Sequence, residues 1–181
     1  MRKIILCAAI YLILLSSTTI SWAQETHLDY TEFGPGILIV PSGIEVINTS
    51  KGSYNLLSND NGIWRTIEII MIPLRNVDRR KPSEQIDDFN YRADQQLKFQ
   101  IDKPGVKLLE NTPFMKYKIN NLEIPTKTTI IFDNGTINRS NCYILKDNNT
   151  GNLVVLAAIT PDAEYEYWKP IIYKMIESIK R

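Results

Sequence analysis

Seven consecutive apolar residues, Leu153 to Ile159, constrain the fold of this 181-residue sequence more than any other feature. Side chains alternate between the two faces of a β-strand, so a strand without polar residues must be covered on both faces. The segment 64–72 has the same character, because apolar residues occupy both odd and even positions from Ile69 to Ile72. Both segments are therefore predicted to be strands in the middle of a sheet with two dry faces.

Turn sequences divide much of the remaining chain into further short strands. Asp60-Asn61-Gly62 and Asp133-Asn134-Gly135 each separate two β-like runs, and Asn-Gly pairs tolerate the positive φ that tight hairpins require. One of the strands alternates apolar residues with Lys116 and Lys118, which indicates an edge strand or one wet face. The predicted strands are 36–40, 44–48, 53–58, 64–72, 106–110, 114–119, 127–133, 140–146 and 152–160.

Two segments instead have the period of an amphipathic helix. The first follows Pro82, with Ser83 as the predicted N-cap, and the second follows Pro161, with Asp162 as the predicted N-cap. Pro170 lies inside the second segment, so that either the chain kinks there or the helix starts close to it. The predicted buried stripes are Ile86, Phe89, Ala93 and Leu97 in the first helix, and Trp168, Ile171, Ile172, Met175 and Ile179 in the second.

The predicted elements fit together most simply as a single α+β domain spanning residues 24–181. An antiparallel β-sheet would carry one helix on each face, which makes an α/β/α sandwich. The alternative places both helices on one face and leaves the other face for a partner.

Residues 1–23 are typical of a secretory signal peptide. Arg2 and Lys3 precede 12 uncharged residues, which span about 18 Å in a helix and are too short for a bilayer core of roughly 30 Å. Small residues at Ser21 and Ala23 predict cleavage between Ala23 and Gln24. We therefore expect residues 24–181 to be exported, to the periplasm or the medium, without stable membrane insertion. An uncleaved anchor reaching Ala23 is the alternative.

The expected mature chain contains few of the side chains from which catalytic sites are built. Its one histidine is His27, and its one cysteine, Cys142, lies in a predicted strand where an inert buried thiol is expected. The sequence has no zinc-ligand cluster, no nucleophile elbow and no phosphate-binding glycine loop, so we expect neither an enzyme nor a cofactor. Removal of residues 1–23 leaves 19 basic and 20 acidic residues, a balance that does not favour nucleic acid.

Two clusters are candidates for a partner surface. Tyr165, Tyr167 and Trp168 are three aromatic residues in a run of four. The alternative is that Trp168 is core and that both tyrosines are half-buried at the rim of the sheet. The second candidate is the basic run Arg79-Arg80-Lys81, for which a solvated loop is the alternative.

The opening and the end of the expected domain resemble a known fold. Ile37-Leu38-Ile39-Val40-Pro41 followed by Ile44-Glu45-Val46, and later Val154 to Ile159 followed by Tyr167-Trp168 and Ile171 to Ile179, carry the resemblance. They are similar to the PsbP-like fold, which is shared with the Ran-binding Mog family and the bacterial DcrB-type exported proteins. The resemblance implies an antiparallel sheet between helices and transfers no activity.

Together these features favour an exported, non-enzymatic domain that binds a protein partner, as an assembly factor, a chaperone-like module or an envelope component. The alternative is a small hydrolase or a ligand carrier with a carboxylate-lined pocket. The sequence leaves the partner and the oligomeric state open.

Overall fold

The computed structural model describes residues 30–33, 36–41, 43–50, 52–74, 81–147 and 151–179. The predicted signal peptide, with its cleavage site at Ala23 and Gln24, lies outside the described residues, as does His27. The strands are β1 (Tyr30–Phe33), β2 (Gly36–Ile39), β3 (Ile44–Ser50), β4 (Ser53–Asp60), β5 (Ile63–Leu74), β6 (Val106–Asn111), β7 (Met115–Ile119), β8 (Leu122–Asp133), β9 (Thr136–Lys146) and β10 (Leu153–Pro161). All nine predicted strands are present, although β8 and β9 begin several residues earlier than expected.

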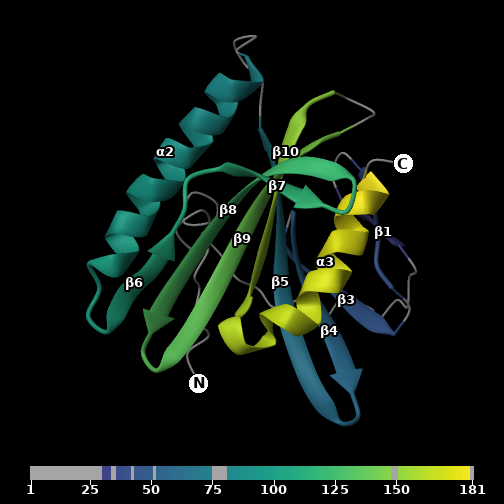
Figure 1. Ribbon diagram of the computed structural model, residues 1–181. Coiled ribbons are helices and arrows are strands. Elements are labelled where there is room, and N and C mark those ends of the chain that lie inside the picture. The colour runs from purple at the N-terminus through teal and green to yellow at the C-terminus, as the bar shows by residue number, and fades with distance from the viewer. Residues whose placement is uncertain are drawn as a thin grey trace.

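Eight of the strands form one antiparallel sheet (Figure 1). Its order is β3-β4-β5-β10-β9-β8-β6. The strand β7 pairs with the first half of β8, and β6 pairs with the second half. β1 and β2 pair only with each other among the described strands. The apolar strand β10 lies between β5 and β9, which confirms its predicted place inside the sheet. The edge position predicted for the segment with Lys116 and Lys118 is likewise confirmed.

The first predicted helix is α2 (Pro82–Ile101), and it begins one residue before the predicted cap. Lys81, not Ser83, is the N-cap residue. Pro82 occupies the first turn, where its missing N–H costs no hydrogen bond. The backbone N–H of Lys81 donates to the Glu84 carboxylate at 3.1 Å, so an acidic side chain of the first turn stabilises the start of the helix.

The second predicted helix starts with a tighter turn than expected. Asp162–Glu164 form a 3-10 helix, η1, and α3 (Tyr165–Ile179) follows directly, so Asp162 belongs to η1 and does not cap α3. Pro170 lies inside α3, and the helix begins before it. No helix among the described residues has the length and apolar character needed to span a membrane.

Two apolar clusters pack on the sheet, and each includes residues of one helix. Residues of α3 belong to a cluster of 18 buried residues, here the α3 cluster, and residues of α2 belong to a cluster of nine, the α2 cluster. Consecutive residues of β10 alternate between the two clusters, as side chains on opposite faces of a strand do. From β10, Val154, Leu156 and Ala158 belong to the α3 cluster, and Val155, Ala157 and Ile159 to the α2 cluster.

Candidate functional site

The connection from β10 to α3 brings charged and aromatic side chains together at one end of the sheet. β10 ends at Pro161, and η1 turns the chain so that α3 can pack against the α3 cluster. The Asp162 carboxylate accepts a hydrogen bond from Arg139 Nε of β9 at 2.6 Å. This ion pair fixes η1 to the neighbouring strand at the point where the predicted aromatic run begins.

Tyr167 is held by contacts on three sides. Its ring packs edge-on against Trp168 with a centroid distance of 5.3 Å, and the Arg65 guanidinium lies 4.5 Å from its centroid. Its hydroxyl shares a hydrogen bond with the Ser58 hydroxyl of β4. Trp168 itself is fully buried, and Tyr167 is half-buried. This burial agrees with the alternative interpretation of the aromatic run, in which Trp168 is core and both tyrosines are half-buried, and the partner surface at Tyr165 and Tyr167 stays a prediction.

Tyr165 belongs to a second group, in which several tyrosine hydroxyls meet. The Arg139 guanidinium lies 4.7 Å from the centroid of its ring. Burial, and to a smaller extent the neighbouring Tyr165, raises the pKa of Tyr143 well above its usual value. The pKa of Tyr173 is also raised, first by burial and then by Tyr165 and Tyr117. The raised pKa values keep Tyr143 and Tyr173 protonated at neutral pH, so both hydroxyls can donate hydrogen bonds.

Beside Tyr167, a groove of about 490 Å³ runs between α3 and the ends of β3 and β4. Ile44, nearly fully buried, forms part of its apolar lining. Two oppositely charged and exposed residues, Asp60 and Lys174, also line it. The lining residues are Pro41, Gly43, Ile44, Ser58, Asn59, Asp60, Tyr167, Pro170, Ile171 and Lys174.

Most of this groove could not be found from the sequence, because its walls come from three separate segments. Asp60-Asn61-Gly62 predicts only a hairpin turn, yet Asn59 and Asp60 line the groove. The pairing of Ile44 with Ser58 in the β3–β4 hairpin brings one wall together. The available signal was Tyr167, a predicted partner-surface residue that also lines the groove.

Of the predicted basic run, the structure describes only Lys81. Arg79 and Arg80 lie outside the described residues. Lys81 is exposed at the start of α2. In Figure 1 the start of α2 and the start of α3 lie at opposite ends of the molecule, so Lys81 is far from Tyr165 and Tyr167. The predicted partner-surface residues that the structure describes therefore lie on two separate surfaces.

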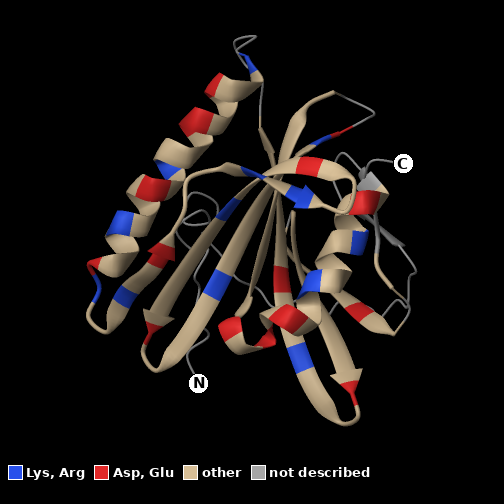
Figure 2. Ribbon diagram, viewed as in Figure 1, with Lys and Arg blue, Asp and Glu red and all other residues tan. Residues whose placement is uncertain are grey.

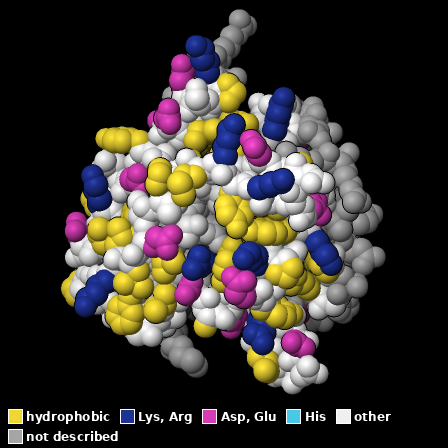
Figure 3. Space-filling view, in the orientation of Figure 1, with side chains coloured by type: hydrophobic (Ala, Val, Ile, Leu, Met, Phe, Trp, Pro, Cys, Tyr) yellow, Lys and Arg dark blue, Asp and Glu magenta, His cyan; other side chains and the backbone are white. Residues whose placement is uncertain are grey.

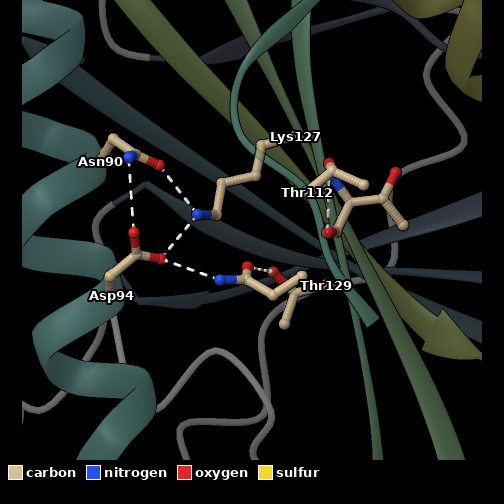
Figure 4. A network of polar contacts seen from close by, with 7 residues as sticks. Asn90, Asp94, Thr112, Lys127 and Thr129 are labelled. Atoms are coloured by element: carbon tan, nitrogen blue, oxygen red, sulfur yellow. Dashed lines mark hydrogen bonds and ion pairs between the residues drawn. The ribbon is translucent and has the colours of Figure 1, made fainter. Parts of the chain in front are cut away.

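A buried lysine forms a second polar cluster, between α2 and the sheet (Figure 4). Lys127 of β8 is only 4% exposed, and its Nζ donates to Asn90 Oδ1 at 2.8 Å and to Asp94 Oδ1 at 2.6 Å. Asn111 Nδ2 of β6 donates to the same Asp94 oxygen, and Thr129 Oγ1 donates to Asn111 Oδ1. The buried ammonium is thus paired and hydrogen-bonded, and the cluster joins α2 to two strands.

The described residues allow cysteine reactivity and metal binding to be assessed directly. Cys142 is buried, and burial raises the pKa of its thiol to about 11, which keeps it protonated and unreactive at neutral pH. No group of three or more His, Cys, Asp or Glu side chains within the described part of the chain could hold a metal ion.

Charges of both signs are spread over the surface. Acidic residues come first along α2 in Figure 2, and basic and acidic residues are interspersed along the rest of the helix. On the face drawn in Figure 3, both signs are interspersed with apolar side chains among the described residues. The described side chains on this face therefore present mixed charges and not a field of one sign.

Comparison with solved structures finds similar folds at low sequence identity. LpqN of Mycobacterium tuberculosis, involved in cell envelope biogenesis, is 16% identical over 85% of this chain and 88% of its own, with a TM-score of 0.46. CyanoP, the PsbP of Synechocystis sp. PCC 6803, is 13% identical over 92% and 97%, with a TM-score of 0.49. The Ran-binding protein Mog1p of Saccharomyces cerevisiae is 10% identical over 87% and 92%, with a TM-score of 0.41.

The PsbP-like and Mog-type resemblance predicted from the sequence thus recurs among these structures, at the level of the fold alone. No protein-family model matches the chain, and neither does any curated protein.

Proposed function

We propose that this protein is an exported, non-enzymatic domain that binds an extended segment of a partner protein in the groove between α3 and the β3–β4 hairpin. The observation that carries the proposal is the combination of an apolar lining with opposite charges, Asp60 and Lys174, in one groove. A segment with an apolar anchor residue between a basic and an acidic residue matches this chemistry.

The rigidity of Tyr167 supports this assignment. Its ring is fixed by Trp168 and Arg65, and its hydroxyl by Ser58. A side chain already held in one position loses little conformational entropy when a partner binds. Tyr167 therefore supplies a preorganised wall, and Pro170, with few backbone conformations of its own, supplies another part of the lining.

Export and the layered architecture are part of the same proposal. The sequence of residues 1–23 supports export. The alternation of β10 residues between two clusters, each with its own helix, supports a sheet with one helix over each face. In that arrangement α3 has one side on the sheet and another side free to line the groove.

A ligand carrier is the second candidate, because a volume of about 490 Å³ also falls in the range of small-molecule pockets. A small hydrolase fits less well. Converging carboxylates would be needed for it, and Asp60 is the one carboxylate among the residues lining the groove.

Site-specific photo-crosslinking in the producing cells tests the proposal. A photoreactive residue at Asn59 is expected to crosslink a partner protein, because Asn59 is exposed at the groove. The same residue at Tyr91, exposed on α2, is the matched control and should give no such product.

A crosslinked product alone does not show that the partner binds in the groove, so the charges of the groove are changed as well. Asp60→Lys and Lys174→Glu should each reduce the crosslinked product at least about tenfold, whereas Lys98→Glu on α2 should leave it unchanged. An Asn59 product that is insensitive to both groove variants would refute the proposal. A small molecule found by native mass spectrometry, with no protein crosslink, would establish the carrier instead.

A further inference from the structure

β6 is an exposed strand at the edge of the sheet. It pairs with β8 on one side, and no described strand pairs with its other side. Residues from Lys107 to Asn111 are all exposed, and Leu108 and Leu109 are 39% and 53% exposed. An edge strand with exposed apolar side chains is a template for pairing with another chain.

A β-bulge in β6 determines on which face its charged side chains lie. Lys107 is opposite Phe132 of β8, and Glu110 is opposite Ile130, with the register shifting between Leu108 and Glu110. Because Phe132 and Ile130 are two residues apart, they share one face of the sheet, and so do Lys107 and Glu110. Without the extra residue, the two charges would lie on opposite faces.

We propose that β6 pairs antiparallel with β6 of a second copy of this chain, about a two-fold axis at the bulge. Each Lys107 then lies opposite Glu110 of the other copy, which gives two cross-strand ion pairs on one face. The four leucines at positions 108 and 109 meet at the axis. The bulge is what makes this register consistent, since residues that face each other across a two-fold axis must lie on the same face.

The other edge strands of the eight-stranded sheet, β7 and β3, do not have this self-complementarity. Antiparallel self-pairing of β7 about Tyr117 would place Lys116 opposite Lys118, and like charges directly opposite are unfavourable. Self-pairing of β3 about Ile47 would place Glu45 opposite Thr49, with no charge to match. β6 is therefore the edge of the eight-stranded sheet on which a second copy fits best.

The small area of the β6–β6 contact predicts a weak dimer. Two strands of six residues bury less surface than a standard stable interface. We expect a reversible dimer with a dissociation constant on the order of 0.1 mM, which becomes weaker as salt screens the Lys107–Glu110 pairs.

Charge reversal with sedimentation equilibrium tests the register. Lys107→Glu and Glu110→Lys should each weaken self-association of the purified protein at least about tenfold, because each places like charges opposite one another. The double variant, with both reversals, should restore it. An equimolar mixture of the two single variants should form a heterodimer, since one copy then presents two acidic side chains to two basic side chains of the other.

Lys118→Glu on the neighbouring edge strand β7 is the matched control and should leave association unchanged. A wild-type protein that stays monomeric at about 1 mM would overturn the proposal. So would a dimer that is insensitive to the single reversals, or one that Lys118→Glu weakens to the same extent.

Discussion

The α3 and α2 clusters differ in how they hold their helices to the same sheet. The α3 cluster has 18 buried apolar residues, and α3 contributes Trp168, Ile172, Met175 and Ile176 to it. The α2 cluster has nine, of which α2 contributes Phe89 and Leu97. The smaller cluster is supplemented by the buried polar contacts of Lys127 with Asn90 and Asp94.

Apolar area and buried charge therefore contribute in different ways in this protein. Apolar packing stabilises in proportion to the area buried. A buried ammonium with two acceptors stabilises little net of its desolvation, yet it permits only one position of the partner helix. We infer that α3 provides most of the stability, and that Lys127 fixes the position of α2.

Truncating one buried side chain in each helix should reveal the largest difference in stability between the two clusters. Ile172→Ala in α3 removes a side chain that is 1% exposed and should lower the free energy of unfolding by about 4 kcal/mol. Leu97→Ala in α2, at 7% exposed, should cost about 2 kcal/mol, because the cavity lies in a smaller cluster. Urea denaturation measures both, and equal losses would remove the distinction.

A smaller effect is expected for the buried lysine. Lys127→Met keeps the apolar stem but leaves Asp94 without its ammonium partner, at a cost of about 2 kcal/mol. Replacing both partners, with Lys127→Met and Asp94→Leu together, should recover most of that loss, since no charge is then left unpaired. Denaturation of the single and double variants is the measurement, and a double variant less stable than Lys127→Met contradicts this assignment.

Glu68 of β5 adds a pH-dependent contribution on the face of the α2 cluster. Burial raises the pKa of Glu68 above its usual 4.5, and the hydrogen bond from Ser53 lowers it by a smaller amount. The folded state therefore binds this proton more tightly than the unfolded state, and stability falls as the pH rises through the range above 4.5. Glu68→Gln should remove this slope and stabilise the protein at pH 7. Parallel stability–pH curves for the two proteins would count against it.

Chemical labelling of Cys142 measures how often the α2 cluster opens, and it needs no substitution in that cluster. The Cys142 thiol is buried among the residues of that cluster, and its pKa is about 11. At pH 8 a disulfide reagent should label it only when α2 or the whole domain opens. Lys127→Met should speed the labelling, while Lys116→Glu on β7, an exposed charge change, should not. Rapid labelling of the folded wild type is the contrary outcome.

The strands, the helices and the central place of β10 could be predicted because they depend on local periodicity. The seven apolar residues of β10 and the stripe of α2 required only the spacing of residues along the chain. The partners of Lys127 could not be predicted, because Asn90 and Asp94 are more than 30 residues away in sequence. The groove escaped prediction for the same reason, since Ser58 and Tyr167 meet only in the folded chain.

Native-state hydrogen exchange compares the anchoring of the two helices in a single experiment. Amides of α2 should exchange through a local opening with a lower free energy than global unfolding, whereas those of α3 should exchange only with global unfolding. Lys127→Met should lower the opening free energy of α2 further relative to that of α3. Equal protection of both helices, or faster exchange in α3, would show that their roles are not divided in this way.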